Sequence, residues 1–472
     1  MQARGSDNPS GSPDPGASSQ REPGHRRLKA GLFLLACTGA GFAPHALDPL
    51  RSLLPALTLA LLLGAYSIRT VFLRTPAAAG TAPSQSGDAA PLVDVVVAAR
   101  DEEAVIARLV QRVVALRWPA GRLRLWVIDD GSVDRTPERL QELQEQLPLL
   151  HVLRRPRDAG GGKSGALNLV LSQLEGRWML VLDADADLQP DVLERLIPFA
   201  ESGGWAAVQL RKAVVNADTN LLTRAQAMEM ALDAEIQEGR LAGGGIAELR
   251  GNGQLLRRDA VQAAGGFNEA TVTDDLDLSF RFLLAGLPIG LLWDPPVQEE
   301  AVLTLPALWR QRQRWAEGGL QRFLDYAPGL LSERLSGSQK LDMVSFFLLQ
   351  YVLPVLSAAD LLAALLTRTP PTVWPFSILA LSLSGLAVLR GCRRPSEGPP
   401  LPAMSLPALA LVIAYLVHWF VVIPWVTLRM TLLPKRLVWA KTQHLGHHDD
   451  GEGPAGEAAD PEVELATEGG PL

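Results

Sequence analysis

The run Asp183 to Asp187 places three carboxylates at alternate positions directly after the apolar stretch Trp178 to Leu182. Their mutual repulsion would be costly unless a cation were bound, and hard oxygen ligands suit Mg²⁺ or Mn²⁺. A Mg²⁺ ion is usually held by one or two carboxylates together with the oxygens of a diphosphate. The run therefore predicts a divalent metal and a nucleotide ligand.

A glycine-rich turn precedes this run, in which Gly160 to Gly162 are followed by Lys163 and Ser164. A P-loop would need glycine at position 157, which is Arg157, so an ATPase of that type is excluded. We expect the turn to present Lys163 and a helix N-terminus to a phosphate group.

Two pairs of adjacent aspartates lie elsewhere in the chain. Asp129 and Asp130 begin the sequence DDGS, which is also a common turn. Asp274 and Asp275 follow a glycine-rich passage, and in isolation they are best explained as a cap of the helix that follows. Neither pair by itself establishes a catalytic role.

A helical pattern runs from Leu308 to Tyr326, and it carries Gln311, Arg314 and Trp315 on one face because these residues are three and four positions apart. An arginine beside a flat aromatic ring suits a phosphate next to a stacked ring. The alternative is an amphipathic helix that lies at a membrane surface.

Alternating short strands and helices must position these side chains. Strands are expected at 92–98, 123–128, 151–153 and 178–182, and helices at 102–116, 136–146, 163–174 and 191–200. The alternation predicts a Rossmann-like α/β domain with a mostly parallel sheet, which binds ligands at the carboxyl ends of its strands. The carboxylates of both DDGS and the Asp183 run are expected at that edge.

The chain has 472 residues, so at least two parts are expected. Its net charge of −7 argues against a dedicated nucleic-acid binder, which carries a basic excess. The segment 449–472 holds eight acids and no Lys or Arg, and the rest of the chain is nearly neutral. This acidic tail and the polar segment 1–29 contain too few large apolar residues to offset their ordering entropy, so both are expected to be disordered.

Apolar residues are concentrated in parts of the chain, since the mean hydropathy is +0.12 although 20% of the residues are charged. Five stretches without Asp, Glu, Lys or Arg approach or exceed the roughly 20 residues of a bilayer crossing. They are 30–47, 52–68, 343–359, 369–389 and 405–428. We expect a transmembrane hairpin over 30–74 and transmembrane or interfacial helices over 341–441. The basic cluster before the hairpin predicts a cytoplasmic N-terminus and a cytoplasmic domain between the two membrane regions.

The number of crossings stays open. Three spans after the hairpin would leave Arg429 and Lys435 outside, against the positive-inside bias. Either 343–359, which is interrupted by Pro354, lies along the membrane interface, or the last segment breaks at Pro424.

Seven motifs occur in order over residues 91–327: VVVAARDEE, IDDGS, GGGKSGALN, LDADAD, GNGQ, VTDDLDLSFR and RQRQRW. In combination they resemble the family 2 glycosyltransferases with a GT-A fold. The resemblance implies an inverting glycosyltransferase that uses a UDP-sugar donor. A nucleotide-binding scaffold without turnover would lack Asp275 or the QxxRW set, and both are present.

The resemblance also implies roles for individual residues. Asp275, with Asp274 where the family usually has glutamate, would be the general base, and Asp183 and Asp185 would hold Mg²⁺ on the diphosphate, with Mn²⁺ as a possible substitute. The donor would contact Glu102, Asp129, Asp130, Lys163, Gln311, Arg314 and Trp315. Asp187 adds a third acid and leaves the metal-binding pair open.

The chain further resembles the cyanobacterial β-monoglucosyldiacylglycerol synthases over nearly its whole length. The matching stretches include QLRKAVVNADTN, AGGGIAELRGNGQLLRRDA and RQRQRWAEGGLQRFLDY. This likeness implies transfer of glucose from UDP-glucose to the hydroxyl of 1,2-diacylglycerol, at a plasma or thylakoid membrane. The alternative is a processive polysaccharide synthase, which shares the motifs but normally needs a transmembrane channel.

Overall fold

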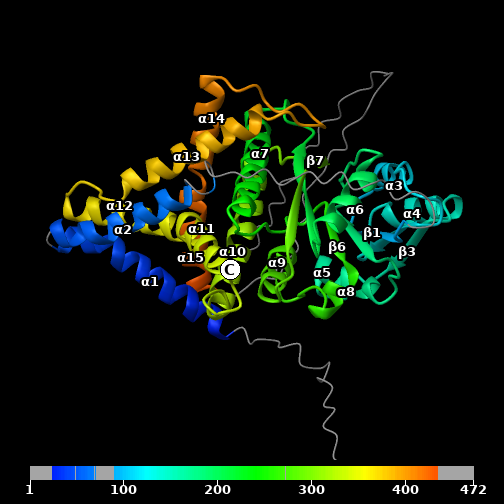
Figure 1. The fold of residues 1–472 in the computed structure, drawn as a ribbon, viewed down its shortest axis with the longest axis horizontal. Coiled ribbons are helices and arrows are strands. Elements are labelled where there is room, and N and C mark those ends of the chain that lie inside the picture. Colours follow the sequence, from blue (N-terminus) through cyan, green and yellow to red (C-terminus); the bar gives the residue numbers. More distant parts are fainter. Residues whose placement is uncertain (1–23, 48, 68–69, 71–89, 272, 434–472) are drawn as a thin grey trace, which may run out of the picture.

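The computed structural model describes residues 24–47, 49–67, 70, 90–271 and 273–433. Figure 1 shows an α/β part and a helical part along the long axis of the molecule, with helices α7 (Leu221–Ala242) and α10 (Leu305–Leu330) between them. Parts of the predicted regions lie outside the described residues: 1–23 and 449–472 of the tails, 48, 68–69 and 71–74 of the hairpin and 434–441 of the C-terminal region. Residues 24–29, which were expected to be disordered, belong to the helix that begins at Gly24.

A seven-stranded sheet in the order β3-β2-β1-β4-β6-β5-β7 forms the α/β part. The strands are β1 (Val93–Ala99), β2 (Leu123–Asp129), β3 (Leu150–Arg154), β4 (Trp178–Leu182), β5 (Ala207–Val214), β6 (Gln254–Arg257) and β7 (Ile289–Glu299). Every neighbouring pair is parallel except those of the short β6, which is antiparallel to β4 and β5. The four predicted strands and the mostly parallel sheet are confirmed.

Helices cover both faces of the sheet, so its strands are buried on both sides. One face packs against α3 (Ile106–Val114), α4 (Thr136–Gln146) and α6 (Val192–Ser202), and the other against α5 (Gly162–Leu171), α8 (Arg258–Ala263) and α9 (Asp274–Leu284). The apolar run of β1 supplies both cores, because Val95 and Val97 point into the first and Val96 and Ala98 into the second.

The helix expected at 102–116 begins only at Ile106 and ends at Val114. The preceding loop is held by other contacts: Asp101 has a positive φ of 56°, and its carboxylate accepts a hydrogen bond from the backbone N–H of Val133 at 2.8 Å. The backbone N–H of Glu102 donates to the hydroxyl of Thr136 at 2.8 Å. These contacts bind the loop after β1 to the loop after β2 and keep it out of the helix.

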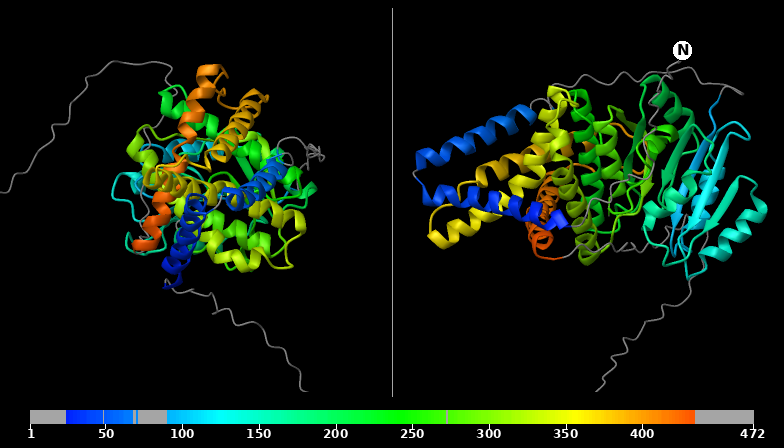
Figure 2. Two further views of the ribbon diagram at one scale, coloured as in Figure 1. Left: turned by 90° about the vertical axis from the view of Figure 1, so that its left-hand side faces the viewer. Right: turned by 90° about the horizontal axis from the view of Figure 1, so that it is seen from below.

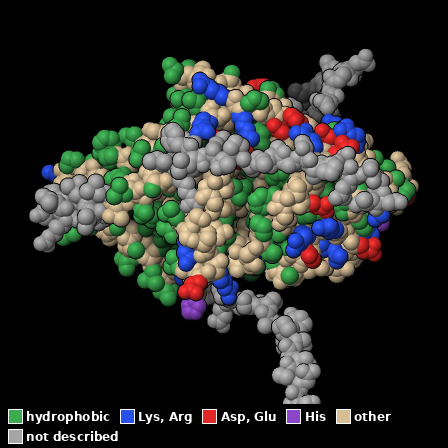
Figure 3. Space-filling view, in the orientation of Figure 1, with side chains coloured by type: hydrophobic (Ala, Val, Ile, Leu, Met, Phe, Trp, Pro, Cys, Tyr) green, Lys and Arg blue, Asp and Glu red, His purple; other side chains and the backbone are tan. Residues whose placement is uncertain are grey.

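The helical part contains α1 (Gly24–Ala46), α2 (Pro49–Ser67), α11 (Gly337–Phe347), α12 (Leu353–Thr367), α13 (Trp374–Arg393), α14 (Leu406–Leu416) and α15 (Trp419–Leu432). By length and composition, three stretches of the described chain could cross a membrane: Gly337–Thr367, Trp374–Arg393 and Leu406–Leu432. Figure 3 shows hydrophobic side chains gathered over this part and charged ones mainly over the α/β part. Leu365 and Leu366 are 70% and 68% exposed, as expected for helices that face lipid.

Contacts at the ends of the helices show which end of each helix lies near the α/β part. Near the α/β part, Arg26 of α1 forms an ion pair with Glu317 of α10, and Arg394, which follows α13, forms one with Glu238 of α7. Near the start of α11, the Ser338 hydroxyl donates to the carbonyl of Gly244 at 2.9 Å.

A second cluster joins the opposite ends of the same helices. His45 Nε2 of α1 lies 3.0 Å from Asp360 Oδ1 of α12, and Asp360 accepts from the backbone N–H of Val373, at the start of α13, at 3.0 Å. Helices α1, α11–α12 and α13 therefore each run between the α/β part and this distant end, which Figure 2 shows as the far tip of the bundle.

Neither Pro354 nor Pro424 breaks its helix, although the sequence offered an interruption at one or the other as alternatives. Gly337–Thr367 is one helical stretch that passes through a π-helical turn at Leu348–Val352, directly before Pro354. Pro424 lies inside α15, and the break in the last segment falls at Val417 and His418 instead.

Candidate active site

A cavity of about 580 Å³ lies at the carboxyl edge of the sheet, between the loops after β1 and β4, the start of α5, the start of α9 and the N-terminal half of α10. Nine of the predicted site residues line it: Glu102, Lys163, Asp183, Asp185, Asp274, Asp275, Gln311, Arg314 and Trp315. Residues from five separate segments of the chain thus come together at one place.

Asp183 and Asp185 follow β4 directly. The carboxylate of Asp183 forms an ion pair with Lys163, and the Lys163 ammonium also donates to the carbonyl of Gly251 at 2.9 Å. The Asp185 side chain accepts from the backbone N–H of Glu300 at 3.3 Å.

The third acid of the run, Asp187, does not line the cavity. Its carboxylate lies 3.0 Å from Arg112 Nε of α3, and its backbone pairs with Gln298 of β7. Asp183 and Asp185 therefore line the cavity, whereas Asp187 is engaged elsewhere, and the choice of metal ligands stays a prediction.

The glycine turn presents Lys163 as predicted. Gly160, Gly161 and Gly162 have positive φ angles of 74°, 69° and 52°, which place Lys163 in the first turn of α5. Burial alone would lower the pKa of the Lys163 ammonium, but the charges of Asp183 and Asp274 outweigh it and raise that pKa. Lys163 is therefore cationic at the start of a helix, where an anionic ligand is favoured.

Asp274 and Asp275 lie in the first turn of α9. Burial, reinforced by the negative charge of Asp274, raises the pKa of the Asp275 carboxyl to about 6. Burial also raises the pKa of Asp274, against the opposing charge of Lys163. A carboxyl group with a pKa near the operating pH is suited to accept a proton from a substrate.

Gln311, Arg314 and Trp315 project from the N-terminal half of α10 into the cavity. The guanidinium of Arg314 lies among the negative charges of Asp183, Asp275 and Asp274. Trp315 stacks beneath the fully buried Arg312, whose Cζ is 4.1 Å from the ring centroid.

Arg312 in turn connects α10 to the helical part. It forms an ion pair with Glu229 of α7, and it donates to the Tyr415 hydroxyl of α14 at 2.9 Å. The indole of Trp419 in α15 donates to the same Glu229 carboxylate at 2.9 Å. This network fixes the ring of Trp315 relative to α14 and α15.

Asp129 and Asp130 are not among the residues that line the cavity in the described part of the chain. They are 1% and 3% exposed, and Asp130 lies 3.4 Å from Arg155 Nε and 3.6 Å from Arg100 Nη1. Burial raises the pKa of Asp130, although both arginines oppose the shift. Their predicted contact with the nucleoside stays a prediction.

The adjoining Gly131 explains part of the DDGS motif. Its φ is +71°, and a Cβ there would overlap the backbone of Arg157, so only glycine fits this turn.

Several residues that line the cavity were not predicted individually, and three of them lie close to the predicted aspartates. Lys212 and Arg250 line the cavity, and they lie in stretches that the sequence singled out only as whole motifs. Thr273, directly before the aspartate pair, also lines it, and its buried hydroxyl has no hydrogen-bond partner among the described residues. Burial alone would lower the pKa of Lys212, but the charges of Glu299 and Asp183 raise it.

The donor set matches a divalent metal that is completed by its ligand. In the described part of the chain no three His, Cys, Asp or Glu residues are grouped closely enough to form a metal site alone. Asp183 and Asp185 supply hard oxygen ligands, and a diphosphate would supply the others. Lys163 and Arg314 can neutralise the remaining negative charge of such a ligand.

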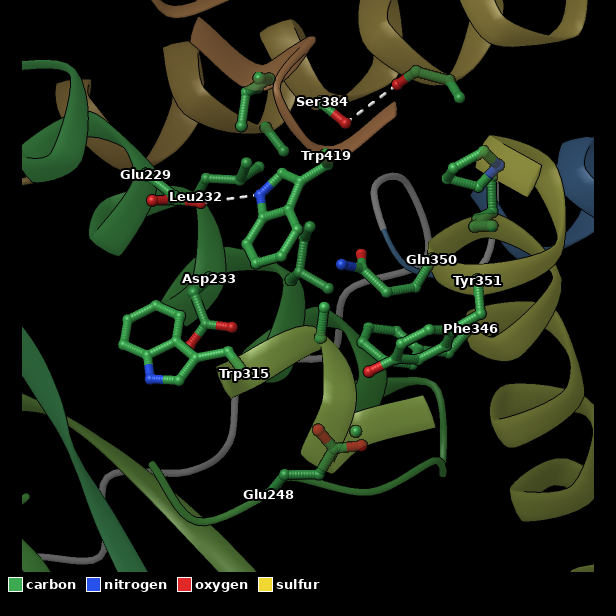
Figure 4. A pocket seen from close by; sticks show the side chains of 18 of the residues that line it. Glu229, Leu232, Asp233, Glu248, Trp315, Phe346, Gln350, Tyr351, Ser384 and Trp419 are labelled. Atoms are coloured by element: carbon green, nitrogen blue, oxygen red, sulfur yellow. Dashed lines mark hydrogen bonds between the residues drawn. The ribbon is translucent and has the colours of Figure 1, made fainter. Parts of the chain in front are cut away.

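A second cavity of about 310 Å³ adjoins the first on the side of the helical part (Figure 4). The two cavities share five of their lining residues: Lys212, Arg250, Thr273, Asp275 and Trp315. Asp275 is therefore accessible from both sides.

Comparisons with known proteins agree with this geometry. The family model described as "Glycosyltransferase like family 2" matches residues 90–318. The chain is 45% identical to a β-monoglucosyldiacylglycerol synthase of Synechocystis sp. over 429 residues, which cover 89% of this chain and 88% of the relative. It is 42% identical to a protein of the same name from Nostoc sp., with coverages of 89% and 90%.

Proposed function

Since the chain belongs to the family 2 glycosyltransferases, we propose that it transfers glucose from UDP-glucose to the free hydroxyl of 1,2-diacylglycerol, to give β-monoglucosyldiacylglycerol. The observation that carries this proposal is the position of Asp275, at the boundary between a charged cavity and a largely apolar one. The first cavity suits a nucleotide sugar and the second a lipid.

The donor occupies the charged cavity in this proposal. Lys163 and Arg314 bind the diphosphate, and Asp183 and Asp185 hold a Mg²⁺ or Mn²⁺ ion against it. A metal bound there would supply Lewis-acid stabilisation of the departing diphosphate. Trp315 forms the wall between the sugar and the acceptor.

Asp275 acts as the general base. Its carboxylate takes the proton of the acceptor hydroxyl as the hydroxyl oxygen bonds to the anomeric carbon. The bond from that carbon to the diphosphate oxygen breaks, and its electron pair leaves on UDP, where Lys163 and Arg314 disperse the charge. Attack opposite the leaving group inverts the anomeric centre, so an α-linked donor gives a β-glucoside.

The apolar lining of the second cavity favours a lipid acceptor over the processive polysaccharide alternative. A growing polymer would need a polar path across the bilayer, whereas this cavity is enclosed mainly by aliphatic and aromatic side chains. The enzyme is associated with the membrane through its apolar helices, which brings the cavity to the lipid.

We also propose that α1, α2, α11–α12 and α13 cross the membrane and that α14–α15 lies along its cytoplasmic side. Tyr415 and Trp419 in the middle of α14–α15 contact α7 and α10, and Arg27 of α1 donates to the carbonyl of Leu432 at its end at 2.8 Å. Both ends of the described chain then lie on the side of the catalytic domain, which agrees with the positive-inside bias.

Metal dependence tests the donor site. Membranes that contain the protein are incubated with UDP-glucose and diacylglycerol, and released UDP is measured with and without EDTA. We expect UDP release to require diacylglycerol, to stop with EDTA and to return with Mg²⁺ or Mn²⁺. Release that is insensitive to EDTA would contradict the assignment of Asp183 and Asp185.

A further inference from the structure

The second cavity is formed where the helical part meets the catalytic domain. Its walls come from the end of α2, from α7 and α10, from the π-helical turn and from α13 to α15. Apolar residues dominate the wall away from the catalytic domain, and they include Leu232, Ile236, Leu349, Leu381, Leu383 and Phe420. Figure 4 shows Trp315 and Trp419 on one side and Phe346 and Tyr351 on the other.

Polarity changes along the cavity. The end next to the catalytic domain carries Asp275 and the ion pair between Arg250 and Asp233, whose closest atoms are 2.9 Å apart. The opposite end carries mostly aliphatic and aromatic side chains of α13 and α14–α15. A ligand that fits both ends has a compact polar group with a hydroxyl at one end and hydrocarbon at the other.

Two polar side chains that line the cavity are not used by the proposed reaction. The Thr273 hydroxyl is buried and has no partner among the described residues. Gln350, on the π-helical turn, points its amide into the cavity (Figure 4). The Gln350 amide can donate a hydrogen bond to an ester carbonyl, and the Thr273 hydroxyl, which lies against Gly318, can do so after its side chain rotates.

We infer that this cavity binds the glycerol backbone and the adjoining acyl-chain segments of the acceptor, with its free hydroxyl at Asp275 and its esters beside Thr273 and Gln350. The inference rests on the proposed function and adds where and in which direction the acceptor binds. A volume of about 310 Å³ is at the lower end of the roughly 300–1,000 Å³ of small-molecule sites. The distal parts of two long acyl chains must therefore lie outside it, among the membrane lipids.

A cavity-filling substitution on α13 tests the inference. Ala380 lines the cavity, whereas its neighbour Leu379 is 39% exposed and does not. Ala380→Phe is expected to raise the KM for diacylglycerol in mixed micelles about tenfold or more, because an inserted ring overlaps the acceptor. The effect on UDP affinity should be much smaller, since UDP binds beyond Trp315. The matched control, Leu379→Phe, should behave as wild type.

The outcomes separate the inference from the proposed function. If wild type transfers no glucose to diacylglycerol, the proposed function fails. If wild type is active and Ala380→Phe has an unchanged KM for diacylglycerol, the inference fails.

A measurement on the wild-type protein covers the case in which Ala380→Phe does not fold. A diacylglycerol with a photoreactive group on the first acyl carbons should label 346–354 and 380–387, and unlabelled diacylglycerol should prevent it. Labelling confined to the outer surface of α12 and α13 would overturn the inference.

Discussion

At the scale of single residues, the chemistry depends on the different surroundings of two acid pairs. Asp183 is neutralised by its ion pair with Lys163. When the donor binds, Lys163 can pair with the diphosphate instead, and a metal can take its place at Asp183. Asp275 instead lies beside Asp274, whose charge together with burial raises the pKa of Asp275 to about 6. Asp183 and Asp185 are therefore suited to bind a cation, and Asp275 is suited to accept a proton.

Replacing the base tests its role. Asp275→Asn should lower kcat about 10²- to 10⁴-fold, the usual contribution of a general base, while UDP-glucose binding measured by calorimetry survives. The raised pKa means that ionised Asp275 destabilises the folded state at pH 7, so the amide should not lower the melting temperature. Turnover retained by Asp275→Asn would show that Asp275 is not the general base.

The same residue predicts the pH dependence. As the pH falls through about 6, Asp275 becomes protonated and can no longer accept the hydroxyl proton. We expect kcat/KM for diacylglycerol to be nearly constant above that pH and to fall about tenfold per unit well below it. A profile that stays flat down to pH 4.5 would contradict the assignment.

At the scale of secondary-structure elements, α10 joins the donor and acceptor sides. Its N-terminal half carries Gln311, Arg314 and Trp315, and the next turn carries Gly318 and Gly319. A Cβ at Gly318 would overlap the side chain of Thr273, and one at Gly319 would overlap the hydroxyl of Tyr351. The two glycines therefore allow α9 and the π-helical turn to approach α10.

Adding a methyl group at this contact should impair catalysis. Gly318→Ala should displace Thr273 and the start of α9, and a shift of about 1 Å in the base can cost on the order of 100-fold in kcat. Gly39→Ala is the matched control, because no atom lies within 4 Å of its Cβ position. Equal glucolipid synthesis by both variants, measured by thin-layer chromatography, would show that the contact is not required.

Much of the site was predictable because local patterns place it. Buried apolar runs end directly before Asp129 and Asp183, and the spacing of Gln311, Arg314 and Trp315 puts them on one helix face. Thr273 and Lys212 lie within quoted motifs, but their place in the site depends on contacts between distant segments, so the sequence does not single them out. The antiparallel β6 has only four residues, too few to show a period.

At the scale of the whole molecule, the structure bears on the number of membrane crossings. Three spans after the hairpin would leave the basic residues Arg429 and Lys435 outside, against the positive-inside bias. Hydropathy alone cannot distinguish a crossing helix from an apolar helix packed along a domain. Leu406–Leu432 is long and apolar enough to cross, yet its middle and its end contact α7, α10 and the start of α1. An even number of crossings follows if this stretch stays on one side.

Cysteine labelling tests this arrangement. In a Cys37→Ala, Cys392→Ala background, Pro370→Cys lies at the distant end of the bundle and Pro395→Cys lies after α13, both at exposed positions. In intact cells, an impermeant maleimide should label the first, and the second should react only after permeabilisation. The reverse pattern would invert the proposed orientation.

Glucosyl transfer to a membrane lipid with inversion can be read from the structure of the product. Membranes containing the protein are incubated with labelled UDP-glucose and diacylglycerol, the lipids are extracted, and the anomeric configuration is determined by NMR. We expect label in a monoglucosyl lipid with a β-linkage, and no such label with Asp275→Asn. Label retained in an insoluble polymer, or an α-linked lipid, would contradict it.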